Sequence, residues 1–210
     1  MRIPFEWKQG EHMTILGRTG SGKTTLASTL LRAKPYVLSV RTKSDRHESL
    51  PGRTVSTSKK WEGFDTNAHT TSRTILTPNY IQFQQRAEIS RALRRIWEEG
   101  GWTLYLDELF YLDDRLKLGS QIDSLLTGGR GKGITVVCGM QRPVRATRFA
   151  MTQSTHLISF AQERRDVRQY LSPISEAWGA AIEGLGPHEF AWYYLPTHAV
   201  WTGDVQALQR

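Results

Sequence analysis

The stretch GRTGSGKTT, residues 17–25, decides the fold of this 210-residue chain. It fits the pattern G-x-x-x-x-G-K-[ST], follows the short apolar run MTIL and opens a segment that bears alanine and leucine. Glycines at these spacings let backbone N–H groups turn toward phosphate oxygens, at the start of a helix whose dipole favours anions. The stretch therefore predicts a phosphate-binding loop between a strand and a helix. Its nine candidate nucleotide contacts are Gly17, Arg18, Thr19, Gly20, Ser21, Gly22, Lys23, Thr24 and Thr25.

Two side chains of this loop have specific expected roles. Lys23 is placed to reach the β- and γ-phosphates of a nucleoside triphosphate, and the Thr24 hydroxyl to ligate Mg²⁺. ATP and Mg²⁺ are therefore the expected cofactors. The loop alone predicts nucleotide binding, and it leaves open what the bound nucleotide is used for.

Apolar runs and amphipathic segments alternate along the rest of the chain. Strands separated by helices of this length favour parallel pairing with helices on both faces, so the expected fold is α/β, a P-loop NTPase with a mainly parallel sheet. We expect one domain over 1–210, with a basic loop or insertion at 41–73 and a closing β-hairpin and tail at 185–210. The predicted strands are 13–16, 36–40, 74–76, 102–108, 134–140 and 155–160, and the predicted helices are 23–32, 81–99, 119–127 and 175–183.

The chain carries a formal net charge of +8. Clustered Lys and Arg favour a polyanionic partner because they displace counterions from nucleic acid, although a basic protein without such a partner is equally compatible with the charge alone. The candidate nucleic-acid contacts fall in two clusters, within residues 41–60 and around residue 145. They are Arg41, Lys43, Arg46, Lys59, Lys60, Arg142, Arg145 and Arg148.

The sequence also predicts a compartment. No apolar run approaches the roughly 20 residues that span a bilayer, and residues 1–13 lack the apolar region of a secretory signal. The single cysteine, Cys138, lies in an apolar run and cannot form an intramolecular disulfide. We therefore expect a protein of the reducing cytoplasm, that of a host cell if the chain is viral.

Two acids end the apolar strand WTLYLDE, residues 102–108. Asp107 is placed to hold Mg²⁺ through water, and Glu108 to polarise an attacking water molecule; the alternative is a pair of solvated acids at a strand end. No N-K-x-D string is present, which argues against a guanine-specific switch. TGGRGKG (127–133) faintly resembles a transporter signature but follows the acid pair rather than preceding it. A small-molecule kinase stays open, although a Glu beside the strand Asp favours hydrolysis.

Two further polar residues flank the strand ITVVCGM, residues 134–140. Gln141 follows it, and carboxyl ends of neighbouring parallel strands converge on the ligand, so this side chain is expected to sense the γ-phosphate or orient water. Arg130 precedes it in a glycine-flanked loop and is placed to act on the γ-phosphate of a neighbouring subunit. A strand cap and a surface arginine, respectively, remain the alternatives.

Taken together, GRTGSGKT, LYLDE and GGRGKGITVVCGMQRP resemble the FtsK–HerA superfamily of DNA-pumping ATPases over about residues 13–160. The last stretch is the most specific, since members carry an arginine, a short glycine-containing turn, an apolar strand and a T-Q-R-P-like ending. The resemblance implies that Gln141 is the sensor and Arg130 the arginine that acts across a subunit interface. Met140 stands where the family commonly has Thr or Ser, and VRTKSD lacks the D-P-like ending often found after the second strand.

About 12 residues precede the first predicted strand, whereas cellular members of the superfamily carry an added barrel, membrane anchor or DNA-reading domain. The chain is most similar in this respect to the genome-packaging ATPases of tailless, membrane-containing double-jelly-roll viruses. The resemblance implies an oligomeric, ring-forming ATPase that moves double-stranded DNA, with partners at a capsid vertex or virion membrane. A cellular or plasmid translocase or helicase, a small-molecule kinase and a nucleotide-dependent assembly protein remain the alternatives.

Overall fold

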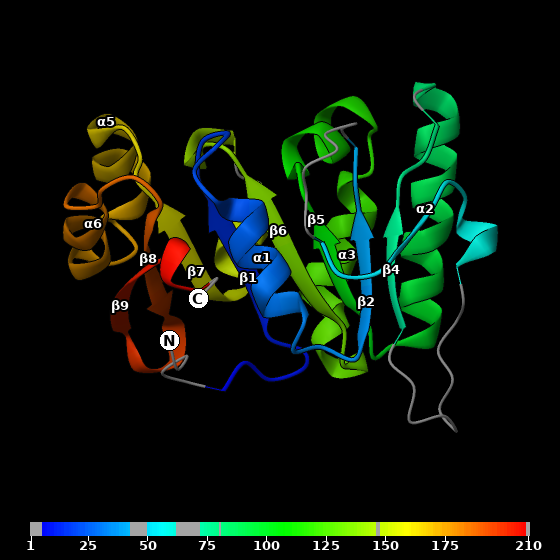
Figure 1. The fold of residues 1–210 in the computed structure, drawn as a ribbon, viewed down its shortest axis with the longest axis horizontal. Helices are drawn as coiled ribbons and strands as arrows, with labels where there is room; N and C mark the ends of the chain where they lie inside the picture. Colours follow the sequence, from blue (N-terminus) through cyan, green and yellow to red (C-terminus); the bar gives the residue numbers. More distant parts are fainter. Residues whose placement is uncertain (1–5, 43–49, 62–71, 80, 146–147, 209–210) are drawn as a thin grey trace.

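A computed structural model describes residues 6–42, 50–61, 72–79, 81–145 and 148–208. One sheet in the order β3-β4-β2-β5-β6-β1-β7-β8-β9 runs through these residues (Figure 1). The strands from β3 to β7 in this order pair in parallel, and β8 and β9 add to the edge in antiparallel fashion. The strands are β1 (His12–Leu16), β2 (Tyr36–Val40), β3 (Arg53–Val55), β4 (Ser72–Leu76), β5 (Thr103–Leu106), β6 (Thr135–Met140), β7 (Ser154–Phe160), β8 (Glu189–Tyr194) and β9 (Ala199–Asp204).

Helices cover both faces of this sheet. In Figure 1, α1 lies in front of β1 and β6, whereas α3 lies behind the sheet and α2 and α6 lie toward its two ends. The helices are α1 (Lys23–Leu31), α2 (Gln82–Glu99), α3 (Gly119–Gly128), α4 (Arg148–Thr152), α5 (Arg164–Asp166) and α6 (Glu176–Glu183). Short 3₁₀ or π-helical turns are η1 (Ser58–Lys60), η2 (Tyr111–Arg115), η3 (Gly129–Lys132), η4 (Pro143–Arg145), η5 (Val167–Leu171), η6 (Leu195–Thr197) and η7 (Gln206–Leu208).

The central strands are buried on both faces, which explains their continuous apolar runs. In β5, Leu104 and Leu106 pack into the core beneath α2 and α3, whereas Tyr105 between them packs on the side of α1. Successive side chains of a strand point to opposite faces, so an unbroken apolar run supplies both layers of core. The sequence pattern and the two-sided helical cover therefore agree.

The predicted fold class is confirmed, down to the C-terminal hairpin formed by β8 and β9. The structure differs in detail within 41–73, where the sequence predicted a loop: β3 and η1 form there and add a strand to the edge of the sheet. A π-helical turn also follows the acid pair, and α4 and α5–η5 were not predicted.

The parallel topology brings several loops to one edge of the sheet. β1, β5, β6 and β7 are neighbours with a common direction, so their carboxyl ends lie side by side. The phosphate-binding loop follows β1, the acid pair follows β5, Gln141 follows β6, and residues 161–166 follow β7. This edge is where an open α/β sheet binds its ligand.

Candidate active site at the carboxyl edge of the sheet

The phosphate-binding loop has the backbone that its glycines permit. Gly20 and Gly22 adopt positive φ angles of 82° and 104°, and Gly22 is the N-cap of α1. Residues with a Cβ atom rarely take up such angles, so glycine is required where the loop turns into the helix. The Lys23 Nζ donates hydrogen bonds to the carbonyl oxygens of Gly17 (2.6 Å) and Arg18 (3.0 Å). Its ammonium group thus lies over the mouth of the loop.

Asp107 meets the loop from the end of β5. Its Oδ1 lies 3.4 Å from the Thr24 hydroxyl, and it accepts a hydrogen bond of 2.8 Å from the hydroxyl of Tyr105. The carboxylate is buried, so these contacts set its orientation. A hydroxyl and a carboxylate are hard oxygen ligands of the kind that Mg²⁺ prefers. The two side chains predicted for the metal are therefore close together.

Glu108 and Gln141 contact each other across the ends of β5 and β6. The Gln141 Nε2 donates to the Glu108 Oε2 at 2.7 Å. A hollow of about 390 Å³ opens beside this pair and is wide enough for water or for a side chain from outside the chain. Its lining residues are Glu108, Phe110, Tyr111, Arg115, Met140, Gln141 and Arg142.

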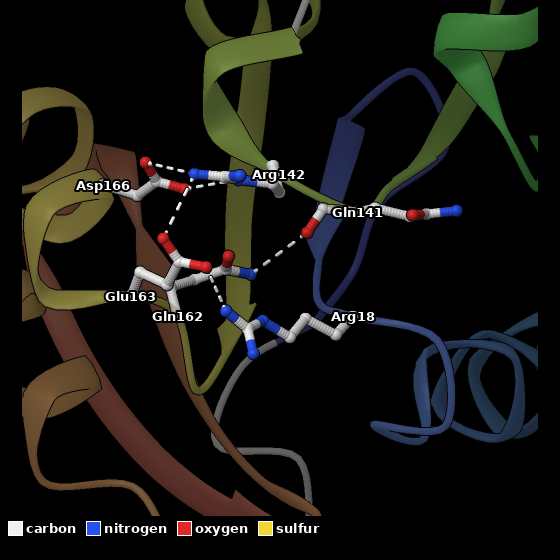
Figure 2. Close-up of polar contacts among 6 residues, drawn as sticks. All are labelled: Arg18, Gln141, Arg142, Gln162, Glu163 and Asp166. Atoms are coloured by element: carbon white, nitrogen blue, oxygen red, sulfur yellow. Dashed lines mark hydrogen bonds and ion pairs between the residues drawn. The ribbon is translucent and has the colours of Figure 1, made fainter.

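A cluster of charged residues joins three of the loops at this edge (Figure 2). Arg142 donates two hydrogen bonds to the Asp166 carboxylate, at 2.8 Å and 3.0 Å, and one of 3.3 Å to Glu163. Glu163 also pairs with Arg18 of the phosphate-binding loop. The hydrogen bonds and charge of Asp166, and then the charge of Glu163, raise the pKa of Arg142 above its ordinary value.

Arg130 lies at the amino ends of the parallel strands, on the side of the sheet opposite the candidate site. It belongs to η3, which precedes β6, whereas Gln141 follows that strand. Six strand residues at about 3.3 Å each separate the two positions by about 20 Å, too far for one bound phosphate to contact both within one chain. The Arg130 Nη2 donates to the Thr155 hydroxyl at 2.8 Å, and its guanidinium, after burial itself, lowers the pKa of His12 to about 4.

The predicted nucleic-acid contacts do not form one surface among the described residues. Lys59 and Lys60 are exposed in η1 beside α2, whereas Arg142 is engaged by Asp166 and Glu163 at the nucleotide edge. Arg41 follows β2 and is half-buried. Lys43 and Arg46, and the side chains of Arg145 and Arg148, lie outside the part of the chain that the structure describes.

Sequence reasoning did not find Tyr105, Glu163 or Asp166. A signal for Tyr105 was present, because residues two apart in a strand point to the same face and Tyr105 stands two before Asp107. No spacing connects Glu163 or Asp166 to the loop at 17–25. Only the pairing of β7 with β1 brings them there.

The chain is similar in sequence or in fold to known viral packaging ATPases. The chain is 28% identical over 149 residues to the DNA packaging ATPase P9 of Enterobacteria phage PRD1, a match of 69% of this chain and 61% of P9. The chain thus spans less than two thirds of the length of P9. The DNA-packaging ATPase B204 of Sulfolobus turreted icosahedral virus has the same fold, with a TM-score of 0.68 and 18% identity over 94% of this chain and 98% of B204.

A second solved structure is B204 of Sulfolobus turreted icosahedral virus 2 in complex with AMPPCP. It matches with a TM-score of 0.68 and 17% identity over 92% of this chain and 97% of that protein. The resemblance to DNA-pumping and genome-packaging P-loop ATPases drawn from the three sequence stretches is confirmed by these relatives.

The family model described as ABC transporter matches residues 1–158. This range contains the phosphate-binding loop, the acid pair and Gln141, and it ends within β7. TGGRGKG lies in it after the acid pair, over the end of α3 and η3. Since the match covers about three quarters of the chain, the chain belongs to the ABC transporter family of P-loop ATPases.

Proposed function

We propose that the protein is an ATP-hydrolysing motor that translocates double-stranded DNA and packages a viral genome into a capsid. One observation carries the proposal: Lys23 and Thr24, the acid pair and Gln141 converge at one edge of the sheet from three separate loops. The names of P9 and B204 as packaging ATPases support the choice of DNA as the substrate that is moved.

The loop binds the triphosphate. Backbone N–H groups of residues 17–25 and the start of α1 surround the phosphate oxygens, and the Lys23 ammonium neutralises charge on the β- and γ-phosphates. Thr24 and Asp107 would hold Mg²⁺, a donor set that suits this ion because it binds proteins through few carboxylates and keeps phosphate and water ligands. The ion, when bound, supplies charge neutralisation at the leaving and transferred phosphates.

Glu108 activates the water that attacks the γ-phosphate. Its carboxylate accepts the water's proton, and the amide of Gln141, 2.7 Å from it, orients Glu108 and responds to the presence of the γ-phosphate. The pair stands at the ends of two buried strands, β5 and β6, which position it. Such preorganised positioning is the main contribution a protein makes to phosphoryl transfer.

Subunits share the catalytic site. Arg130 is exposed and about 20 Å from its own Gln141, so its guanidinium serves a neighbouring subunit's γ-phosphate in a ring. The DNA backbone is held by basic side chains, of which Lys59 and Lys60 are exposed among the described residues. Phosphate contacts carry no sequence information, as a motor that moves along any sequence requires.

The test is steady-state ATP hydrolysis by the purified protein with and without long double-stranded DNA. Turnover should rise with DNA and disappear in Glu108→Gln, which keeps the shape of the side chain but accepts no proton. Absence of DNA stimulation, or full turnover in Glu108→Gln, refutes the motor. Strand separation without directional movement would instead favour a helicase, and phosphorylated product without DNA would favour a kinase.

Mixing variants tests the shared site. Arg130→Ala and Lys23→Ala subunits should each be inactive alone, since one lacks the trans arginine and the other lacks nucleotide binding. A mixture should recover part of the wild-type rate, because some interfaces pair an intact Lys23 site with an intact Arg130. With mixed assemblies demonstrated by differential tagging, the absence of recovery removes Arg130 from the mechanism.

A further inference from the structure

The loop that follows β7 contacts both the phosphate-binding loop and the end of β6 (Figure 2). We propose that Asp166 in this region is a positioning residue: it holds Arg142, and through Arg142 it fixes Gln141 beside Glu108. The inference rests on the proposed function, because the reaction that it positions is the hydrolysis of ATP. Arg142 then acts at the nucleotide-binding edge, in contact with Asp166, rather than as a DNA contact.

The contact between Asp166 and Arg142 is built to fix orientation. The Asp166 side chain is 5% exposed, and its two carboxylate oxygens accept separate hydrogen bonds from the Nε and Nη2 of Arg142. A bidentate pair of a planar guanidinium and a carboxylate restrains both the distance and the angle of the arginine. Removing the charge of the buried carboxylate should therefore weaken the restraint on Arg142.

The restraint reaches the predicted sensor through one peptide bond. Arg142 follows Gln141 directly, and the Gln162 side-chain amide, also from the loop after β7, donates to the Gln141 carbonyl oxygen at 3.5 Å. The Gln141 side chain in turn donates to Glu108. A continuous set of contacts thus runs from the buried Asp166 to Glu108, the group that accepts the water's proton. It passes through Arg142 and its neighbour in the chain, Gln141.

Glu163 adds a second, weaker connection. It accepts from Arg142 at 3.3 Å and pairs with Arg18, so it ties the end of β6 to the phosphate-binding loop. Its side chain is 47% exposed and that of Arg18 is 59% exposed, and pairs so open to solvent contribute little and are screened by salt. Asp166 is therefore the residue on which the position of Arg142 mainly depends.

The double-mutant cycle of Asp166→Asn and Arg142→Gln tests the proposal. A misplaced catalytic group slows turnover more than it weakens binding, so each variant should lose at least about 10-fold in kcat while KM and the Kd for ATP change by less than about 3-fold. If the two residues act through one contact, the double variant should lose no more than the more severe single variant. Arg168→Gln is the matched control: Arg168 lies two residues beyond Asp166 and pairs with Glu183 at the surface.

Each other outcome overturns the assignment. Unchanged kcat in Asp166→Asn excludes positioning, and multiplicative losses in the double variant show that the residues act separately. A parallel fall in melting temperature, ATP affinity and kcat means that Asp166 only stabilises the fold. These results require a wild-type protein that hydrolyses ATP; a wild type without hydrolysis refutes the proposed function itself, and this inference falls with it.

Discussion

At the scale of single residues, Tyr105 holds the carboxylate that would support the metal. Its hydroxyl donates to the Asp107 Oδ1 at 2.8 Å from within the core, where the Tyr105 side chain is fully buried. Partners of this kind, one step removed from a metal, typically change metal affinity 10- to 100-fold when they are lost. The side chain therefore belongs to the site through its contact with Asp107.

Replacement of Tyr105 by phenylalanine should raise the Mg²⁺ concentration needed for half-maximal ATP hydrolysis by about 10-fold, because Asp107 loses a donor that orients it. The measurement is a Mg²⁺ titration of the steady-state rate at saturating ATP. Tyr193→Phe is the control, since Tyr193 is equally buried in β8 but bonds to His198, away from the loop. An unchanged titration in Tyr105→Phe would show that Asp107 is oriented without the hydroxyl.

Lys59 and Lys60 provide a second prediction at this scale. Each contact between a lysine and a DNA phosphate releases counterions, and its loss reduces the slope of log affinity against log salt by about 0.9. The double variant Lys59→Gln, Lys60→Gln should therefore bind duplex DNA more weakly and with a slope shallower by about 2. Lys8→Gln, an exposed lysine just before β1, serves as the charge control. A slope equal to that of the wild type would exclude both lysines from the DNA contact.

Residue-scale prediction works where chemistry imposes a spacing. The loop at 17–25 and the acid pair carry their spacing in the chain itself, and the structure brings Thr24 within 3.4 Å of Asp107. Asp166 has no such signature, because the partner that explains its burial, Arg142, is 24 positions away and approaches only once β7 lies beside β1. The proposed catalytic roles, including those of Glu108, Gln141 and Arg130, stay predictions until the variants are measured.

At the scale of elements, the ends of β5 and β6 approach closely at Gly139. A Cβ atom on Gly139 would stand 2.6 Å from the carbonyl oxygen of Asp107, a distance at which the backbone must shift. β6 therefore needs glycine here for the acid pair to stay where the loop can reach it. The glycine is conformationally ordinary and is required for space alone.

Gly139→Ala should move the end of β5, lower the free energy of unfolding by about 1–3 kcal/mol and reduce kcat along with it. Urea unfolding and steady-state hydrolysis measure the two effects. Gly131→Ala is the matched control, because a Cβ atom there meets nothing within 4 Å, and its stability should stay within about 0.5 kcal/mol of the wild type. Equal stability of the two variants would mean that the strand ends adapt without cost.

The elements that sequence patterns missed share a physical cause. β3 has only three residues, two of them exposed, and it forms because the edge of β4 offers backbone partners. Trp97, near the end of α2, is 37% exposed and packs over Gly128 of α3, where a Cβ atom would lie 2.8 Å from its ring. Long periodic segments such as α2 were predictable because their apolar face alone specifies them.

At the scale of the whole molecule, buried histidines make stability depend on pH. Burial, followed by the charge of Arg130, lowers the pKa of His12 from 6.5 to about 4, and burial also lowers that of His156. As the pH falls, His12 takes up a proton near pH 6.5 in the unfolded chain but only near pH 4 in the folded protein. The stabilisation is therefore present above pH 6.5 and is lost as the pH falls toward 4.

The wild type should be less stable at pH 5 than at pH 7.5, with His12 alone contributing about 2 kcal/mol of the difference. Denaturant unfolding at the two pH values measures this. His12→Asn should show a smaller difference in stability between the two pH values, because asparagine does not titrate. The difference that remains should include the contribution of His156. An identical difference in the variant and the wild type would contradict the role of His12.

No helix among the described residues is long and apolar enough to cross a bilayer. Within those residues the sheet runs without interruption from β3 to β9, so the nucleotide edge and the closing hairpin share one framework. Val205, just after β9, illustrates the connection: its side chain would stand 3.3 Å from a Cβ atom on Gly22 of the phosphate-binding loop. Val205 thus links the hairpin to the phosphate-binding loop by packing beside Gly22.

The position of β1 in the sheet has a consequence for how the protein is made. The ribosome releases β1 and the phosphate-binding loop long before β6 and β7, yet β1 lies between these two strands, with Met13 paired to Val137 on one side and to His156 on the other. A nascent chain therefore keeps an apolar strand and a glycine-rich loop without partners for more than a hundred residues of synthesis. Such distant pairings fold slowly and expose the chain to aggregation, so newly made protein should depend on chaperones until β7 has emerged.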